Sequence, residues 1–362
     1  MTTSTPALDL HADVADLTAA LIDIESVSGN EAALADAVES ALRELGHLQV
    51  LRDGDALLAR TNLGRAERVI LAGHLDTVPL PAVPGSRGTV PSSWQDGLLY
   101  GRGATDMKGG VAVQLALAAS LAAPTRDVTY VFYDHEEVQA SLSGLGRLVR
   151  NQPELLQGDF AILLEPTDGT VEGGCNGTIR LEARTVGKAA HSARAWMGQN
   201  AIHAAAEILV RLRDHEPATV TVDGLDYRES LNAVKIHGGT AGNVIPDHAV
   251  VEINYRFAPD KTPDDAEAYV RRLLDGFAVV RTDAAAGARP GLDHPAAADF
   301  VRAVGQEPKP KYGWTDVARF SELGIPAVNF GPGDALLAHT DNEHVSAEAI
   351  RACLAALRTW LG

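Results

Sequence analysis

One segment of the sequence places an imidazole and three carboxylates directly after an apolar run: V-T-Y-V-F-Y-D-H-E-E-V. Residues 128–133 are typical of a buried strand, and the polar residues 134–137 follow at its end. Carboxylates crowded at one strand end repel one another and are costly to bury. The adjacent Glu136 and Glu137 therefore predict a positive charge between them.

Similar polar residues occur in four other motifs: G-H-L-D-T-V-P, G-R-G-A-T-D-M-K-G-G, L-L-E-P-T and L-L-A-H-T-D-N-E-H-V. Most of these motifs close an apolar run, so the fold is expected to bring them to one rim. The full set of candidate residues is His74, Asp76, Asp106, Glu136, Glu137, Glu165 and His339. Imidazoles and carboxylates without cysteine form a ligand set that suits Zn²⁺, Mn²⁺ or Co²⁺. Two such ions would balance this much negative charge.

The spacing of His74 and Asp76 also favours a metal site. In an extended chain, residues two apart share a face, so Asp76 can accept the second N–H of the His74 ring. Taken alone, H-x-D is more typical of a turn with a capping aspartate. The nearby glycines do not form a P-loop, because no G-K-[ST] follows them. They are instead expected to let the backbone pass close to a crowded site.

The elements that must position these residues alternate between helix and strand. Helical spacing is present at about 13–27, 31–45 and 110–122, and apolar strands are expected at 69–72, 128–133 and 158–164. Continuous apolar strands between helices are typical of a mostly parallel, helix-covered sheet. Ligands of such sheets bind beyond the carboxyl ends of the strands.

The pattern changes near residue 177, where strands begin to alternate between apolar and polar residues. The expected elements are strands 178–186, 234–236 and 250–257 and helices 200–213 and 263–274. After residue 290 the α/β pattern returns, with a strand at 327–330 and a helix at 347–361. We therefore expect a catalytic domain of residues 1–176 and 290–362, interrupted by an inserted α+β domain of residues 177–289.

Composition excludes several classes of protein. The 362 residues carry a net charge of -17 at pH 7, which argues against a nucleic-acid partner. The two cysteines, Cys175 and Cys353, form no disulfide framework. Neither a signal peptide nor a run of 18 apolar residues is present, so we expect a cytoplasmic protein without a membrane partner.

The five motifs also occur in the order found in a known family. Over essentially the whole chain, the sequence resembles the zinc-dependent amidohydrolases and exopeptidases of the M20 peptidase clan. The resemblance implies a zinc-peptidase-like catalytic domain with two Zn²⁺ ions, for which Co²⁺ or Mn²⁺ can substitute. It implies the following roles: His74 and Glu165 on one ion, Glu137 and His339 on the other, Asp106 between them, Glu136 as general base and Asp76 as the partner of His74.

The inserted domain carries a further motif of this family. The segment G-K-A-A-H-S-A resembles the family segment that precedes the dimerisation helix. The resemblance implies a homodimer formed through this dimerisation or lid domain, with His191 holding the developing oxyanion. Asn243, in G-G-T-A-G-N-V-I-P, is expected to be a second polar contact. The alternative for His191 is a cap or turn histidine.

Cationic residues near the motifs bear on the substrate. Arg256 and Arg319 suit carboxylates, and Thr315 lies in the same late segment as Arg319. The texts G-C-N-G-T-I-R and A-H-S-A-R-A-W-M-G-Q-N-A-I-H most resemble actinobacterial succinyl-diaminopimelate desuccinylases. This implies hydrolysis of N-succinyl-LL-2,6-diaminopimelate, a small N-acyl diamino acid of lysine and cell-wall precursor synthesis.

The segment Y-G-W-T-D-V-A-R departs from the usual family text, which is closer to G-G-T-S-D-A-R. Trp314 and the extra residue before Arg319 could reshape the acyl pocket. Three alternatives stay open: an acetylornithine deacetylase, another aminoacylase or carboxypeptidase of the same fold, and a catalytically silent metal-binding homologue.

Overall fold

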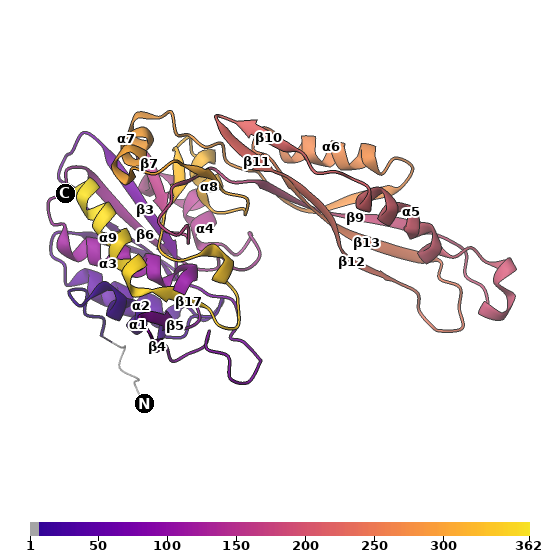
Figure 1. The fold of residues 1–362 in the computed structure, drawn as a ribbon, viewed down its shortest axis with the longest axis horizontal. Coiled ribbons are helices and arrows are strands. Elements are labelled where there is room, and N and C mark those ends of the chain that lie inside the picture. The colour runs from indigo at the N-terminus through magenta and orange to yellow at the C-terminus, as the bar shows by residue number, and fades with distance from the viewer. Residues whose placement is uncertain (1–6) are drawn as a thin grey trace. The chain divides into compact units, whose positions relative to one another are not determined.

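The computed structural model describes residues 7–362. Its chain divides into two compact units, each with its own sheet (Figure 1). The first unit runs to Gly173 and resumes with Gly291–Lys309 and Arg319–Gly362. The second unit comprises Gly174–Pro290 and Pro310–Ala318.

An eight-stranded sheet forms the centre of the first unit. Its order is β1 (Gln49–Asp53), β2 (Ala56–Arg60), β6 (Asp127–Tyr133), β3 (Arg68–His74), β7 (Phe160–Leu163), β16 (Ala327–Asn329), β8 (Glu172–Gly173) and β15 (Lys309–Pro310). The four central strands β6, β3, β7 and β16 are parallel. The pairs β1–β2, β2–β6 and β16–β8 are antiparallel. The predicted α/β fold is confirmed, and the sheet is mixed because antiparallel strands flank its parallel centre.

Both faces of the central strands are buried, which explains their continuous apolar sequence. Every residue from Val69 to Ala72 is fully buried, and Val69 and Leu71 belong to the core cluster of the helices on one face. These helices are α1 (Val14–Ile22), α2 (Ala32–Arg43), α3 (Gly109–Ser120), α7 (Pro295–Val304) and α9 (Ala347–Leu361), seen beside the sheet in Figure 1. Two shorter helices, α4 (Gly144–Asn151) and α8 (Val317–Glu322), complete the described α-helices outside the inserted segment.

The parallel strands bring their carboxyl ends to one edge of the sheet. Strand β3 ends at His74, β6 ends just before Asp134, and Glu165 comes two residues after β7. Residues that are distant in sequence therefore meet at this edge, as the apolar strand pattern predicts.

A small three-stranded sheet was not predicted. It consists of β17 (His344–Ser346), β5 (Leu98–Tyr100) and β4 (Ser93–Gln95), with His344 opposite Tyr100. These strands have only three residues each, which is too short for a clear alternation. Their pairing brings the late H-T-D-N-E-H motif next to the G-R-G segment.

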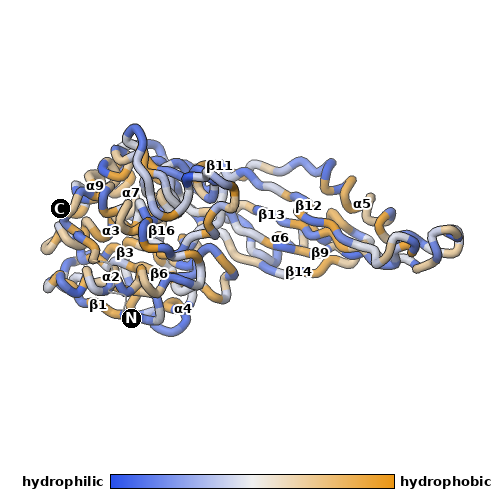
Figure 2. The backbone as a smooth tube through the Cα atoms, turned by 90° about the horizontal axis from the view of Figure 1, so that it is seen from below, coloured by the Kyte–Doolittle hydropathy of each residue, from blue (hydrophilic) through white to orange (hydrophobic). Residues whose placement is uncertain are grey.

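The second unit contains a four-stranded antiparallel sheet with one covered face. Its order is β12 (Ser230–Gly238), β13 (His248–Phe257), β9 (Gly177–Val186) and β14 (Ala278–Ala285). Helices α5 (Ala201–Arg213) and α6 (Pro263–Leu273) pack on one face, so alternate residues of β9 and β13 are buried. The tube of Figure 2 changes between hydrophilic and hydrophobic colours along these strands. A hairpin of β10 (Thr219–Val222) and β11 (Leu225–Arg228) completes the unit.

Some residues lie in a different unit from the one predicted. Residues 174–176, residue 290 and residues 310–318 were expected in the first unit, but they belong to the second. The backbone N–H of Asn176 donates to the carbonyl of Lys311 (3.2 Å), and the Trp314 indole donates to the carbonyl of Ala286 (3.0 Å). These hydrogen bonds are the physical reason for the difference.

None of the helices within residues 7–362 has the length and apolar character needed to cross a membrane.

Candidate metal centre

His74 is the last residue of β3, and its ring is almost fully buried. Its Nδ1 lies 2.9 Å from the backbone carbonyl oxygen of Asp76, and its Nε2 lies 3.1 Å from Oδ1 of Asp106. The predicted partner of the ring N–H is the Asp76 carboxylate, but its Oδ1 is 3.6 Å from Nδ1. The carbonyl is the nearer acceptor because the chain turns back over the ring at this strand end.

The buried Asp76 carboxylate has a different task. It accepts the backbone N–H groups of Glu136 (2.9 Å) and Glu137 (3.0 Å), and the Ser28 hydroxyl (2.6 Å). One carboxylate thus fixes the backbone of both glutamates after β6. The two N–H groups bind different oxygens of Asp76, so both residues are held by the same carboxylate.

Asp106 lies between two imidazoles. Its Oδ1 faces Nε2 of His74 at 3.1 Å, and its Oδ2 faces Nε2 of His339 at 3.4 Å. Nε2 of His339 is also 2.8 Å from Oε1 of Glu137. A carboxylate that offers one oxygen to each of two nitrogen ligands has the arrangement of a bridge between two cations. The potential ligand atoms of His74, Asp106 and Glu137 all lie within 4.8 Å of one another.

Glu165 is 5% exposed and comes two residues after β7. Its negative charge is one of the influences that raise the pKa of His74, which places it within electrostatic reach of that ring. Glu136 is half-buried beside Glu137. The structure therefore brings the predicted residues of five separate motifs to one edge of the first unit.

Protons on the imidazoles balance the carboxylates of this group. Burial of the His74 ring opposes protonation, but the hydrogen bond to Asp106 and the surrounding carboxylates raise its pKa well above the ordinary value. Hydrogen bonds to Asp106 and Glu137 raise the pKa of His339 to about 10. Burial alone would raise the pKa of Asp106, yet the hydrogen bonds from the two imidazoles hold it below its usual range. Positive charge close to these carboxylates is therefore electrostatically favourable.

This donor set fits a metal site. Two imidazole nitrogens and several carboxylate oxygens suit Zn²⁺, Co²⁺ or Mn²⁺. The two cysteines are buried elsewhere in the chain and take no part.

Sequence reasoning missed Glu343, which lies in the same late motif as His339. Its carboxylate is 1% exposed and accepts the backbone N–H groups of Gly103 (3.0 Å), Thr105 (3.0 Å) and Asp106 (3.1 Å). It also forms a buried ion pair with Arg102 at 2.8 Å. Glu343 therefore positions the loop that carries Asp106. The only signal in the sequence was an acidic residue near a proposed ligand.

Close backbone approach explains the glycines near the site. A Cβ on Gly110 would lie 2.2 Å from the carbonyl oxygen of Leu164, the residue before Glu165. Gly331 approaches the same carbonyl, where a Cβ would lie at 2.3 Å. Helix α3 and the chain after β16 can reach the Glu165 backbone only because these residues have no side chain.

The remaining predicted residues belong mainly to the second unit. His191 and Asn243 are exposed and adjacent, because the Ser192 N–H donates to the Asn243 carbonyl (2.9 Å). The His191 ring also accepts the Ala193 N–H at 3.1 Å, so it serves here as a cap.

Arg256 extends from β13 and is half-buried. Burial and the charge of Arg180 lower its pKa. Its Nε donates to Asn254 (3.2 Å), and no carboxylate of residues 7–362 forms an ion pair with it. Thr315 is buried in the second unit, whereas Arg319 belongs to the first, where its guanidinium lies against Gly146 of α4.

Comparison with known proteins identifies the family of this chain. Residues 70–362 match the sequence profile of peptidase family M20/M25/M40. The succinyl-diaminopimelate desuccinylase of Corynebacterium glutamicum is 44% identical, over 98% of this chain and 98% of its own. The chain belongs to the M20 peptidase family.

A second relative and a solved structure extend the comparison. A Mycobacterium tuberculosis protein, provisionally named as a succinyl-diaminopimelate desuccinylase, is 52% identical over 98% of this chain and 99% of its own. An M20 family metallo-carboxypeptidase from Sulfolobus solfataricus has the same fold, with a TM-score of 0.77 over 96% of this chain and 98% of that chain, at 16% identity.

Proposed function

We propose that this M20 protein hydrolyses N-succinyl-LL-2,6-diaminopimelate to succinate and LL-2,6-diaminopimelate. The observation that carries the proposal is the Asp106 carboxylate shared by His74 and His339, with Glu136 and Glu137 held beside it by Asp76. The similarity to the Corynebacterium glutamicum desuccinylase supports the substrate. A biosynthetic enzyme of this kind would act in the cytoplasm.

Two zinc ions fit the proposed ligands. His74 and Glu165 would hold one ion, Glu137 and His339 would hold the other, and Asp106 would bridge them. Zinc held by these residues would lower the pKa of a bound water and polarise the amide carbonyl. Co²⁺ and Mn²⁺ would satisfy the same oxygen and nitrogen ligands.

Glu136 is the proposed general base. Oδ1 of Asp76 accepts its backbone N–H, which fixes the backbone from which the Glu136 side chain extends. It takes a proton from the attacking water as the water oxygen bonds to the amide carbon. It then delivers that proton to the departing nitrogen as the C–N bond breaks, which yields the carboxylic acid and the free amine.

The substrate carries three carboxylates, which need cationic partners. Arg256 is the best candidate in the second unit, because its guanidinium has no carboxylate partner within the described chain. Asn243 would add an amide contact, and Thr315 and Arg319 would contribute from the segment after β15. His191 would donate to the developing oxyanion once its cap contact is released.

The second unit is proposed to form a homodimer. Strand β12 lies at the edge of its sheet, and its exposed residues include Val234 (60%) and Ile236 (46%). An edge strand with exposed apolar side chains is a template for pairing with another chain. A second copy of β12 would pair with this edge strand and cover its exposed apolar side chains.

The test is a comparison of kcat/KM for N-succinyl-LL-diaminopimelate and N-acetylornithine with zinc-loaded protein. A preference for the succinyl substrate of at least tenfold is expected, because only this substrate supplies a carboxylate in its acyl group. A preference for acetylornithine would retain the mechanism and assign a deacetylase. Hydrolysis of dipeptides alone would assign a peptidase. Tight zinc binding without any hydrolysis would make the protein a silent metal-binding homologue.

A further inference from the structure

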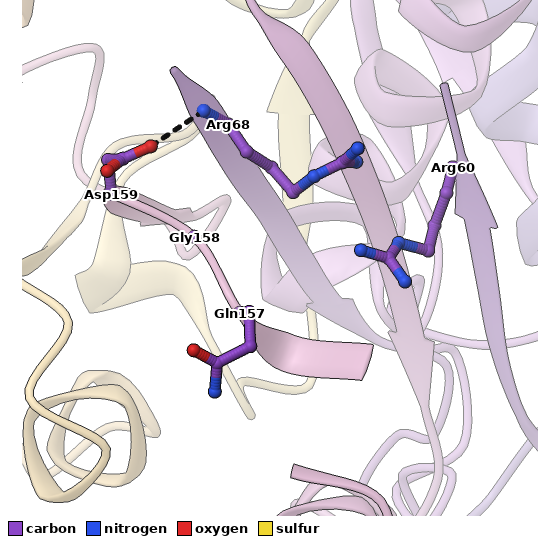
Figure 3. A pocket seen from close by; sticks show the side chains of 5 residues that line it. All are labelled: Arg60, Arg68, Gln157, Gly158 and Asp159. Carbon is purple, nitrogen blue, oxygen red and sulfur yellow. Dashed lines mark hydrogen bonds between the residues drawn. The ribbon is translucent and has the colours of Figure 1, made fainter. Parts of the chain in front are cut away.

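A cavity of about 300 Å³ lies far along the sheet from the metal residues. It is lined by Arg60, Arg68, Gln157, Gly158 and Asp159 (Figure 3). Strand β3 begins at Arg68, and β7 begins just after Asp159. The cavity, called here the arginine cavity, is therefore at the amino ends of these parallel strands, whereas the metal residues follow their carboxyl ends.

Two guanidinium groups share one face of the sheet at the arginine cavity. Arg60 is the last residue of β2 and is paired with Thr129 of β6. Arg68 extends toward Thr129 from β3, on the other side of β6. Its Nη1 lies 3.1 Å from the hydroxyl oxygen of Thr129. Figure 3 shows the two side chains extending from their own strands toward the strand between them.

The two arginines differ in their hydrogen-bond and ion-pair partners. Arg68 donates to the carbonyl of Thr61 (2.9 Å), and its Nη2 lies 3.8 Å from Asp127. Arg60 has no ion pair and no hydrogen-bond acceptor among residues 7–362, and its Nε is buried. Burial and the neighbouring charge of Arg68 lower the pKa of Arg60 by more than the charge of Asp127 raises it.

The other lining residues leave room for a ligand. Asp159 is engaged elsewhere, since its Oδ2 accepts the backbone N–H of Arg68 at 2.8 Å. Gly158 has no side chain, and a Cβ there would lie 3.0 Å from the Ile70 side chain. Gln157 is exposed, and its amide nitrogen donates to the carbonyl of Pro153 (3.3 Å). The charged groups of the lining are thus two guanidiniums and one carboxylate.

We propose that the arginine cavity binds a small tetrahedral oxyanion, a phosphate or sulfate group, with Arg60 as its main ligand. The terminal nitrogens of the planar Arg60 guanidinium match two oxygens of such a group, and the group's negative charge would compensate the cation. Arg68 adds a second positive charge. This site is independent of the metal centre and of the proposed function.

Thermal unfolding of the zinc-loaded protein tests the proposal, with sulfate varied at millimolar concentrations and constant ionic strength. The wild-type protein is expected to show a saturable rise in Tm. Arg60→Gln should lose this rise. In chloride alone it should unfold at or above the wild-type temperature, because an unpaired charge has been removed. Arg302→Gln removes an exposed arginine of the same unit, whose side chain is 74% exposed, and should respond like the wild type.

A second variant covers the case in which Arg60→Gln does not fold. Arg60→Lys keeps the charge but loses the fork, and it should bind sulfate at least tenfold more weakly. An unchanged sulfate response in the variant that folds would overturn the proposal.

The source of the oxyanion can be distinguished by calorimetry with inorganic phosphate and adenosine monophosphate. Equal Arg60-dependent affinities would support a free anion. Tighter binding of the nucleotide by at least tenfold would support a phosphate carried on a metabolite. If phosphate, sulfate and the nucleotide bind only to sites that survive Arg60→Gln, the proposal is wrong.

Discussion

Glu136 and Glu137 are adjacent in sequence but have different surroundings. Oε1 of Glu137 lies 2.8 Å from Nε2 of His339, within the group of potential metal ligands. The backbone N–H of Glu136 is held by Oδ1 of Asp76, and that of Glu137 by Oδ2. We propose that Glu137 binds metal while Glu136 accepts the proton.

Glu136→Gln should therefore retain both metal ions and lose turnover. General-base catalysis contributes about 10²–10⁴-fold to the rate. The kcat of the variant should therefore fall by at least the lower of these factors, about 10²-fold. Metal analysis of the purified variant and steady-state kinetics measure the two effects. Glu154→Gln changes an exposed glutamate of the first unit and should leave both unchanged. Full activity of the Glu136 variant would remove this residue from the role of base.

Metal binding should release protons from the two imidazoles. In the metal-free protein, hydrogen bonds to Asp106 and Glu137 raise the pKa of His339 to about 10, compared with about 6.5 for a free histidine. The pKa of His74 is also raised. The proton on His339 stabilises the metal-free fold fully below about pH 6.5, and this contribution is lost as the pH rises toward 10. A ligating imidazole must be neutral, so zinc affinity should increase with pH.

Calorimetric titration with zinc at pH 8, in buffers of different ionisation enthalpy, counts these protons. About one proton per imidazole is expected, and His339→Ala should release one fewer. Zinc binding without proton release would contradict the proposed imidazole ligands.

The types of the site residues could be predicted from the sequence, but the atoms through which they make contact could not. The motif order was enough to select His74, Asp106 and His339 as neighbours. It did not reveal that Asp76 uses its carbonyl for His74 and its carboxylate for the glutamate backbone. Glu343 was missed because the backbone groups that it binds are more than 230 residues away in sequence, as with Thr105 (238 residues).

The loop that carries Asp106 depends on Glu343. Removing the charge by Glu343→Gln leaves Arg102 buried without its ion-pair partner and weakens three backbone hydrogen bonds. Breaking such a buried pair costs about 3–5 kcal/mol of unfolding free energy. Urea unfolding should show this loss, and zinc affinity should fall because Asp106 is no longer fixed. Glu348→Gln, an exposed change at the start of α9, is the control. Unaltered stability and zinc affinity in the Glu343 variant would exclude this positioning role.

The contact of α3 with the end of β7 gives a second prediction at the scale of elements. In Gly110→Ala, the new Cβ would lie 2.2 Å from the Leu164 carbonyl oxygen, so the helix must shift away from the Glu165 backbone. Overpacking of this kind costs about 1–3 kcal/mol. Gly46→Ala is the matched control, because no atom lies within 4 Å of its new Cβ. Equal melting temperatures for the two variants would show that α3 can move without cost.

Elements with a strong pattern were predictable and short ones were not. The strands at 69–72 and 128–133 are continuously apolar because both faces of the sheet are covered. Strands β4, β5 and β17 have three residues each and are defined by pairing between distant segments. No local pattern could predict that pairing.

For the whole molecule, the change of strand pattern near residue 177 indicated an inserted domain. The sequence did not indicate that residues 310–318 belong to the second unit, because this segment has no regular periodicity. Its place depends on contacts with Asn176 and Ala286. The predicted pocket residue Thr315 consequently belongs to the second unit, and Arg319 to the first.

The proposed dimer can be tested at the edge strand β12. Val234→Asp combined with Ile236→Asp places like charges where two copies of β12 would meet, so the dimer should dissociate. Sedimentation velocity measures the mass, and zinc content should not change. Val280→Asp on β14, at the opposite edge of the same sheet, is the control. A double variant that remains dimeric would assign the interface to another surface.

The central claim is that the group around Asp106 holds two metal ions and cleaves a succinyl amide. The most direct measurement is a titration of metal-free protein with zinc, in which succinate release from N-succinyl-LL-diaminopimelate is followed at each step. Activity is expected to increase until two zinc ions are bound per chain and then to remain constant. A plateau at one ion, or no succinate release with two ions bound, would contradict the account.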